Sequence, residues 1–476
     1  MSAILPPPVS LAAPLTIWLT DRSRFKTGLS RCPRQRYLGS HFGPSGYGIT
    51  PKAESLPLAT GKYVHSGIET WMTALQATDT LPSLEVCRAV IGRVQQEYET
   101  AVTARGFRGV LAGTETDETI QEQKTLIAGL LWAVRLKFLP WFQARYRVIE
   151  SEQERLHFLD CTCGAAATDE AEHIRRGCLG HALMIRTDIL AENRVGGGSL
   201  AYFEVKTTGW ESSAWAEQWE TDYQLALGTL DLKARYGKEV TELYVVGLNK
   251  GARRRDKVEG IAVGRRKQAS ALCYGYCRPG NAPLSQDDWL PAYQWVDADG
   301  QNRRASRAHL RRGVWELAQS DWPVWESYRR DDPEMPVEEL WVKMLPAVVL
   351  DSVCFVLGPM NRQDAQLTAV RRAMLAEEIR WQERLWELYE WLPLGFGSDQ
   401  VQEALDRLAP QSWACRPFGA EAQCEFVPIC HRQSGWQDPL AMGRYKLRRP
   451  HHAPELEQAV ARGLLMEETT EVEETE

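Results

Sequence analysis

The sequence predicts an α/β fold with a helical accessory region. Residues 184–206 read as two strands joined by a glycine-rich turn, and residues 242–248 are a further β run of valines and aromatics. Several other stretches place apolar residues three and four positions apart, which is the spacing of one helix face. The length of 476 residues allows two or three structural units and a sizeable core.

Composition favours an ordinary globular protein. Charged residues make up 25% of the chain and hydrophobic residues 44%, with a net charge of −7. The chain therefore lacks a global basic field, although DNA enzymes often confine positive charge to one groove. No apolar run is expected to approach the length of a membrane span, and the N-terminus lacks the basic start of a signal peptide. We expect a cytoplasmic protein whose eleven cysteines are thiols or metal ligands rather than a disulfide framework.

The N-terminal part is expected to pass from an irregular lead-in at residues 1–29 into helices. Residues 30–37 open a helix with Pro33 in its first turn. Longer helices are predicted at residues 58–75, 82–105 and 115–145. The buried face predicted for the first of these comprises Val64, Ile68, Trp71, Met72 and Leu75. His65 on the same helix is either a core or capping histidine or a metal ligand.

Residues 147–158 are expected to form a strand with three glutamates, Glu150, Glu152 and Glu154, on one face. One of the three is a candidate outer acid of a site, and a solvent-facing strand edge is the alternative. In the hairpin at 184–206 the run of glycines at 196–198 supplies the reversal. Its second strand should turn three apolar residues into the core: Ala201, Phe203 and Val205.

Two acids and a lysine of this hairpin are expected to converge. Asp188 lies on the first strand, and Glu204 and Lys206 lie on the second. Alternate side chains of a strand share a face, so Glu204 and Lys206 point the same way as Tyr202. Carboxylate oxygens are ligands for hard divalent cations, and a neighbouring lysine can orient a metal-bound water against a phosphodiester. The alternative is a chance Glu-x-Lys triplet on a solvated face.

After the hairpin, residues 212–236 are predicted to be one helix, with Gln224 beside its apolar face. A basic run follows the strand at 242–248 and is either a solvated loop or a phosphate-contacting one. Its candidate DNA-contacting residues are Lys250, Arg253, Arg254 and Arg255. Residues 261–410 are expected to form a mostly helical accessory region that includes an amphipathic helix at 365–391. The tail at 436–476 is acidic and is expected to be disordered from about residue 466.

Two groups of cysteines have metal-ligand character. The first group lies within an insertion at residues 157–182, and its candidate metal ligands are Cys161, Cys163, His173 and Cys178. These residues are either a tetrahedral zinc site or ordinary reduced thiols. The second group lies at 413–432 and comprises Cys415, Cys424 and Cys430. A four-ligand metal site built on these three cysteines needs one more ligand, and Cys32 is the candidate. Thiolate-only ligation suits zinc and iron–sulfur clusters alike, and unconnected thiols are the remaining alternative.

These motifs, in this order, resemble those of a nuclease family. Asp188 with Glu204-x-Lys206 is similar to the core motif of the PD-(D/E)xK nuclease superfamily. Gly61-x-x-x-His65 resembles a motif of RecB-type nucleases and of the related CRISPR-associated exonucleases. Gln224 matches half of the Gln-x-x-x-Tyr motif of RecB-like enzymes, and Gly228 stands in place of its tyrosine, so the role of Gln224 is open. One early cysteine with a late triad resembles the iron–sulfur staple of AddB-type nucleases.

The resemblance implies a restriction-endonuclease-like core at residues 30–260, in which helices flank a central mixed sheet. A cysteine loop at 411–435 would close the staple. It implies an Mg²⁺- or Mn²⁺-dependent deoxyribonuclease, with exonuclease action favoured, in DNA processing, recombination or repair in a phage or host. DNA is the implied partner, with a helicase or recombinase as a candidate second partner and no membrane.

The resemblance also assigns roles to residues. The metal ligands would be His65, Asp188, Glu204 and the Val205 carbonyl, and Lys206 would polarise the attacking water. A structural [4Fe–4S] cluster would be held by Cys32, Cys415, Cys424 and Cys430. Two alternatives stand beside this reading. One is an inactive nuclease-fold module for DNA binding or assembly, and the other is a zinc-bearing structural protein in which Glu-x-Lys is chance.

Overall fold

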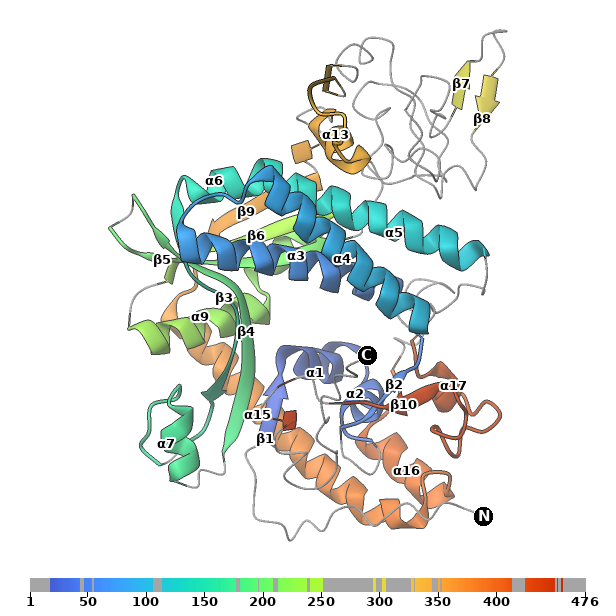
Figure 1. The fold of residues 1–476 in the computed structure, drawn as a ribbon. Coiled ribbons are helices and arrows are strands. Elements are labelled where there is room, and N and C mark those ends of the chain that lie inside the picture. The colour runs from blue at the N-terminus through green and yellow to red at the C-terminus, as the bar shows by residue number, and fades with distance from the viewer. Residues whose placement is uncertain are drawn as a thin grey trace, which may run out of the picture.

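In the computed structural model the chain is an α/β protein built around one central sheet (Figure 1). It describes residues 18–42, 47–53, 55–105, 114–161, 163–176, 180–195, 197–208, 213–237, 240–250, 294–296, 302–304, 327–328, 330–344, 350–351, 353–412, 424–449, 452 and 455–456. The expected Arg253, Arg254 and Arg255 loop lies outside these residues, as do residues 1–17 and the acidic end at 466–476.

The central sheet is mixed and has six strands among the described residues, in the order β1-β4-β5-β6-β9 with β3 also paired to β4. Its strands are β1 (Trp18–Asp21), β3 (Tyr146–Phe158), β4 (His181–Asn193), β5 (Leu200–Thr208), β6 (Val240–Asn249) and β9 (Cys354–Met360). The pairs β1–β4 and β5–β6 are parallel, and the other pairs are antiparallel. The strands predicted at 147–158, 184–206 and 242–248 are confirmed.

The β4–β5 hairpin follows the predicted alternation. Ala201, Phe203 and Val205 are buried in a cluster on one face of the sheet, whereas Leu200 and Tyr202 are buried in a cluster on the other. Gly197 and Gly198 of the connecting turn have φ of 70° and 80°, a region that L side chains rarely adopt.

The sheet forks at β4. Strand β3 pairs with β4 from Ala182 to Asn193 and so takes one edge along nearly its whole length. Strands β1 and β5 must therefore share the other edge, where β1 pairs with residues 181–184 and β5 with residues 189–192. Residues 185–188 lie between these two partners. Asp188 is the residue at which β5 separates from β4.

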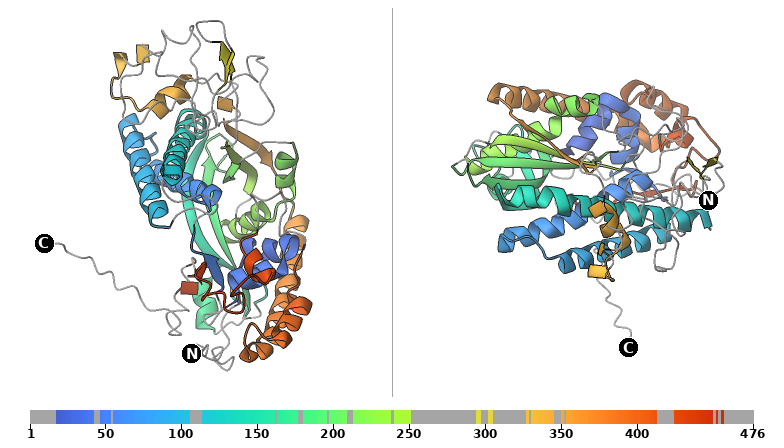
Figure 2. Two further views of the ribbon diagram at one scale, coloured as in Figure 1. Left: turned by 90° about the vertical axis from the view of Figure 1, so that its right-hand side faces the viewer. Right: turned by 90° about the horizontal axis from the view of Figure 1, so that it is seen from above.

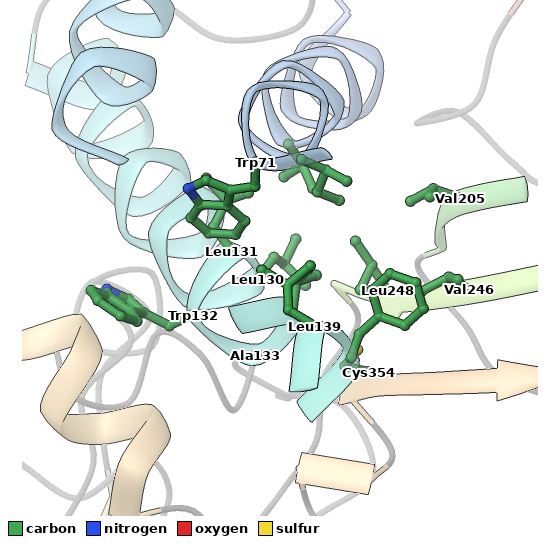
Figure 3. Packing of buried hydrophobic residues seen from close by; sticks show 14 of the residues in the cluster. Trp71, Leu130, Leu131, Trp132, Ala133, Leu139, Val205, Val246, Leu248 and Cys354 are labelled. Atoms are coloured by element: carbon green, nitrogen blue, oxygen red, sulfur yellow. The ribbon is translucent and has the colours of Figure 1, made fainter. Parts of the chain in front are cut away.

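One face of the sheet is covered by the predicted N-terminal helices (Figure 2). They are α3 (Leu56–Thr78), α4 (Leu84–Arg105), α5 (Thr114–Ala133), the π-helical turn η2 (Val134–Phe138) and α6 (Leu139–Gln143). Figure 3 shows Trp71 beside Leu131, with Leu130 and Leu139 between them and the strand residues Val246 and Leu248. The predicted buried face of α3 is confirmed from Val64 to Leu75.

The expectation about membrane-length runs needs a correction. Gln123–Gln143 is long and apolar enough to cross a membrane by length and composition, but most of this stretch is buried inside the protein. Its residues supply core contacts for α3 and the sheet. Such burial is what a core helix requires.

The opposite face carries α9 (Tyr223–Tyr236) and α15 (Asp364–Trp391) (Figure 2). The single helix predicted at 212–236 is wrong, because α8 (Ser213–Glu217) and the 3-10 turn η3 (Gln218–Glu220) precede a break. Asp222 has extended backbone there and its side chain accepts from the amide of Gln224 at 2.7 Å, which caps a new helix.

The start of the chain also differs from the prediction. Residues 18–29 are not irregular, because β1 joins the sheet and leads into α1 (Arg22–Lys26) and the π-helical turn η1 (Thr27–Arg31). Asp21 caps α1 by accepting from Arg24 N at 2.9 Å. Helix α2 (Pro33–Ser40) has proline in its first turn, as predicted. With β1 and β9, the sheet recruits residues from outside 30–260.

The N-terminal and C-terminal parts pack together. Strand β2 (Ile49–Pro51) pairs with β10 (Tyr445–Leu447), so part of the predicted tail is a strand. Helix α2 shares a hydrophobic cluster with α15, α16 (Asp399–Leu408) and α17 (Val427–Cys430). The remaining described elements are α7 (Glu170–Arg175), β7 (Gln294–Val296), β8 (Asn302–Arg304), α13 (Val337–Met344) and η6 (Leu392–Leu394).

Candidate active site

The fork in the sheet brings two acids close enough to influence each other's charge. The β4–β5 ladder ends at the pair Ile189–Phe203, and beyond it Asp188 Oδ2 accepts from the amide of Val205 at 2.7 Å. The Asp188 side chain thus takes the place of a backbone hydrogen bond between β4 and β5. This bond holds Asp188 against β5, the strand that carries Glu204. Burial, and then the charge of Asp188, raise the pKa of Glu204 to about 7.

Glu204 is fully buried and is held by three donors. The Lys206 ammonium and the Gln224 amide both contact its Oε1, and the Tyr202 hydroxyl donates to its Oε2. Burial, and then the Glu204 charge, raise the pKa of Tyr202 well above its ordinary value, so the phenol keeps the proton that it donates. The predicted shared face of Tyr202, Glu204 and Lys206 is confirmed, and Gln224 joins it from α9.

The Lys206 ammonium is held in its charged form. Burial disfavours the charge, but the carboxylates of Glu204 and Asp188 outweigh it, and the pKa of Lys206 is raised. About a quarter of the side chain is exposed to solvent. A cation here can both neutralise Glu204 and reach an incoming anion.

Gly61 explains how His65 comes to the site. A Cβ on Gly61 would lie 2.9 Å from Thr207 Oγ1, so the absence of a side chain at this position lets α3 approach β5 without displacing that hydroxyl. One turn later His65 faces the fork, with Nδ1 3.3 Å from Glu152 Oε1. Burial opposes a charge on His65, but Asp188 and the Glu152 hydrogen bond raise its pKa above the ordinary value.

Glu152 is the one of the three candidate glutamates that the structure brings to the fork. It lies between the paired residues Ser151–Ile189 and Gln153–Thr187, so it stands opposite Asp188. Its φ of 50° is in the left-handed region, which is rare for a side chain other than glycine. Arg186 Nε donates to its Oε2 at 2.5 Å.

The predicted shared face of Glu150, Glu152 and Glu154 is wrong. Glu150 accepts from Tyr236 of α9 at 2.6 Å, whereas Glu152 meets His65 of α3 on the opposite face of the sheet. Glu154 instead contacts His452 near the C-terminus. The left-handed residue and a bulge after Val148 break the alternation that the prediction assumed.

The three residues best placed to hold a cation are His65, Glu152 and Asp188, whose ligand atoms lie within 4.8 Å of one another. One imidazole and two carboxylates suit Mn²⁺ or Mg²⁺. Glu204, also an expected ligand, contacts the Lys206 ammonium. Val205 was expected to contribute its carbonyl, whereas the structure shows its amide donating to Asp188. The sequence offered Glu152 as one of three candidates but could not select it, because its position depends on strand register.

Gly228 departs from the Gln-x-x-x-Tyr motif for a steric reason. A Cβ on Gly228 would lie 2.6 Å from Cε1 of the Tyr202 ring. The space beside this turn of α9 is thus filled by a tyrosine from β5, and that tyrosine donates to Glu204. The helix supplies the amide of Gln224 and the strand supplies the phenol.

Lys250 is the described member of the basic run. Its amide donates to the Thr208 carbonyl at 2.8 Å, which places it at the end of β5 and β6 just past Lys206. Burial lowers the pKa of Lys250 to about 8, so it is largely protonated at neutral pH.

Two of the four expected iron ligands, Cys32 and Cys430, lie near residues 410–411, the segment that leads to Cys415. Cys32 is buried directly before α2, with Sγ 3.8 Å from the Pro410 carbonyl. Gln411 Nε2 donates to the Cys430 carbonyl at 2.9 Å. The residues after α16 therefore touch both the early cysteine and the C-terminal turn.

Cys424 and Cys430 pack against the hydrophobic cluster that contains α2. Burial, and to a smaller degree these two thiols, raise the pKa of Tyr445 to about 12. Cys415 lies outside the described residues. Of the other expected set, Cys161, Cys163 and His173 are brought together, and Cys178 lies outside the described residues.

No family model matches the chain, and no curated protein matches it. The geometry of the fork is accordingly the basis for any functional conclusion.

Proposed function

We propose that the chain is a PD-(D/E)xK-type nuclease that hydrolyses DNA phosphodiesters with Mg²⁺ or Mn²⁺. The observation that supports this most is the meeting of a histidine, three acids and a lysine at the fork between β4 and β5. They come from α3, β3, β4 and β5, and the close approach at Gly61 brings the helix within reach.

His65, Glu152 and Asp188 would hold the cation, with Glu204 beside them. A bound divalent cation would polarise the phosphate and lower the pKa of a bound water. Lys206 stays protonated and offsets the negative charge that develops on the phosphate. Gln224 and Tyr202 keep the Glu204 carboxylate in one orientation.

The same proposal includes a structural [4Fe–4S] cluster on Cys32, Cys415, Cys424 and Cys430. It is supported by the thiol donors themselves and by the packing of α2 against the C-terminal turn. Hydrolysis needs no electron transfer, so the cluster would tie the chain ends together. Cys32→Ala is expected to lose the iron and sulfide of anaerobically purified protein; full retention would remove Cys32 from the set.

The test of activity is cleavage of linear, end-blocked and circular DNA in Mg²⁺, Mn²⁺ or EDTA. Wild-type protein should cleave only with metal, and Lys206→Ala should lose roughly a hundred- to a thousandfold in rate. Lys124→Ala is the matched control, because Lys124 is an equally shielded lysine paired with Glu99 on the outer helices. Cleavage of linear but not end-blocked or circular DNA would identify an exonuclease.

Other outcomes contradict the proposal in distinct ways. Metal-independent DNA binding without cleavage would identify an inactive module for binding or assembly, to which a helicase or recombinase could attach. Neither binding nor cleavage would leave a metal-bearing structural protein. Wild-type cleavage by Lys206→Ala would remove the lysine from the active site.

A further inference from the structure

A second constellation of ligand atoms lies where β3 turns toward β4. The Sγ atoms of Cys161 and Cys163 are 2.8 Å apart, and Cys163 Sγ is 3.3 Å from His173 Nδ1. All three ligand atoms lie within 4.8 Å of one another. The acids and lysine of the fork take no part in this group.

The tautomer of His173 is fixed by its surroundings. The ring is fully buried and stacks on Phe158, with centroids 3.6 Å apart and planes 16° apart. Its Nε2 lies 2.9 Å from the Ala166 carbonyl, which can only accept, so Nε2 carries the proton. Nδ1 is left with a lone pair directed at Cys163. A backbone carbonyl on the far nitrogen is the usual arrangement of a metal-binding histidine.

The nearby His181 is excluded from this group. Its Nδ1 lies 2.7 Å from Asp160 Oδ2 and its Nε2 lies 3.1 Å from the Gln382 side chain, so both ring nitrogens are engaged. His173 is thus the histidine of the segment that presents a lone pair to the thiols.

We infer that Cys161, Cys163 and His173 bind a zinc ion that is separate from the nuclease site. Two thiolates and one imidazole are soft and borderline ligands, which select zinc over the hard cations suited to carboxylates. In a structural zinc site with four ligands, these three residues would fill three of the tetrahedral positions. Their compact spacing within one segment is typical of a structural zinc site rather than one assembled across the fold.

Such an ion would tie together residues 161–173, directly after the end of β3, the strand that carries Glu152. Around the site, Phe158 N donates to Ala167 O at 2.7 Å and Leu159 N donates to His181 O at 2.8 Å. Arg371 of α15 donates to the Leu159 carbonyl at 3.0 Å. Zinc would therefore order the segment onto which α15 docks, while Glu152 and Asp188 lie further along the strands.

The experiment measures zinc in full-length protein purified without chelator. Wild-type protein is expected to hold about one zinc more per chain than Cys163→Ser or His173→Ala. Cys87→Ala is the control, because Cys87 is a buried free thiol in the helical core and should leave zinc unchanged. Equal zinc in wild type, Cys163→Ser and His173→Ala would overturn the inference.

A second measurement needs no variant and stays decisive if the substitutions prevent folding. Cys161 and Cys163 of wild-type protein should resist alkylation until a chelator is added, as read by peptide mass spectrometry. Equal alkylation with and without chelator would overturn the inference. Zinc content and thiol protection do not depend on DNA cleavage, so failure here and failure of the nuclease proposal are distinguishable.

Discussion

The fork site and the cysteine–histidine group are built in opposite ways. The fork collects two carboxylates and one imidazole from α3, β3 and β4, far apart in the chain, and holds them by sheet register and helix packing. The second group takes its thiols and imidazole from residues 161–173 alone. One site therefore depends on the whole fold, and the other on a local turn. Changes that separate the two test this contrast.

The largest expected effect follows from neutralising one acid of the fork. Asp188→Asn keeps the shape and an oxygen that can accept from Val205, but it removes the charge that would bind a cation. Cleavage should fall roughly a hundred- to a thousandfold, while zinc content and melting temperature stay near wild type. Asp364→Asn, an exposed acid on α15, is the control. Loss of zinc in Asp188→Asn would contradict the separation of the sites.

Glu204 should oppose stability at neutral pH because its pKa is raised to about 7. The folded state then binds the proton of Glu204 more tightly than the unfolded state does. Protonated Glu204 therefore stabilises the fold below the ordinary glutamate pKa, and this stabilisation is lost as the pH rises toward 7. The stability of Glu204→Gln relative to wild type should therefore rise between about pH 4.5 and pH 7 by up to roughly 3 kcal/mol. Chemical denaturation in EDTA measures it, and a pH-independent difference would refute the raised pKa.

The fork also shows which features a sequence reveals. Asp188, Glu204 and Lys206 could be predicted because alternation along one hairpin fixes their face. Glu152 could not, because its left-handed backbone and its register against β4 are set by tertiary packing. The break at Asp222 was missed because a cap outweighed the helical spacing around it. Strand β9 joins the sheet across a long connection, which periodicity does not register.

The close approach of α3 gives a smaller, steric test. Gly61→Ala should push the helix off Thr207 and move His65, and cleavage should fall about tenfold, which corresponds to about 1.4 kcal/mol. Gly92→Ala is a matched control, because a Cβ at that helical glycine meets nothing within 4 Å. Adding Thr207→Ala should recover most of the activity, since the clash is removed. Equal losses in Gly61→Ala and the double variant would show that the contact does not position His65.

The smallest expected effect concerns the phenol that β5 supplies beside Gly228. Tyr202→Phe removes one of the three donors to Glu204 and leaves Lys206 and Gln224 in place. A hydrogen bond to a charged group contributes about 1.5–3 kcal/mol, and the two remaining donors limit the loss, so we expect cleavage to fall by about five- to tenfold.

Tyr236→Phe tests whether that loss belongs to the site. It removes an equivalent tyrosine–glutamate hydrogen bond, from Tyr236 to Glu150, on the same face of the sheet. If both variants lose stability equally and neither loses activity, the phenol only packs. If Tyr202→Phe alone loses activity and the acidic limb of its pH–rate profile shifts, Tyr202 orients Glu204 and tunes its pKa. That result would make Tyr202 a positioning residue. The absence of a side chain at Gly228 would then be what leaves room for the Tyr202 ring.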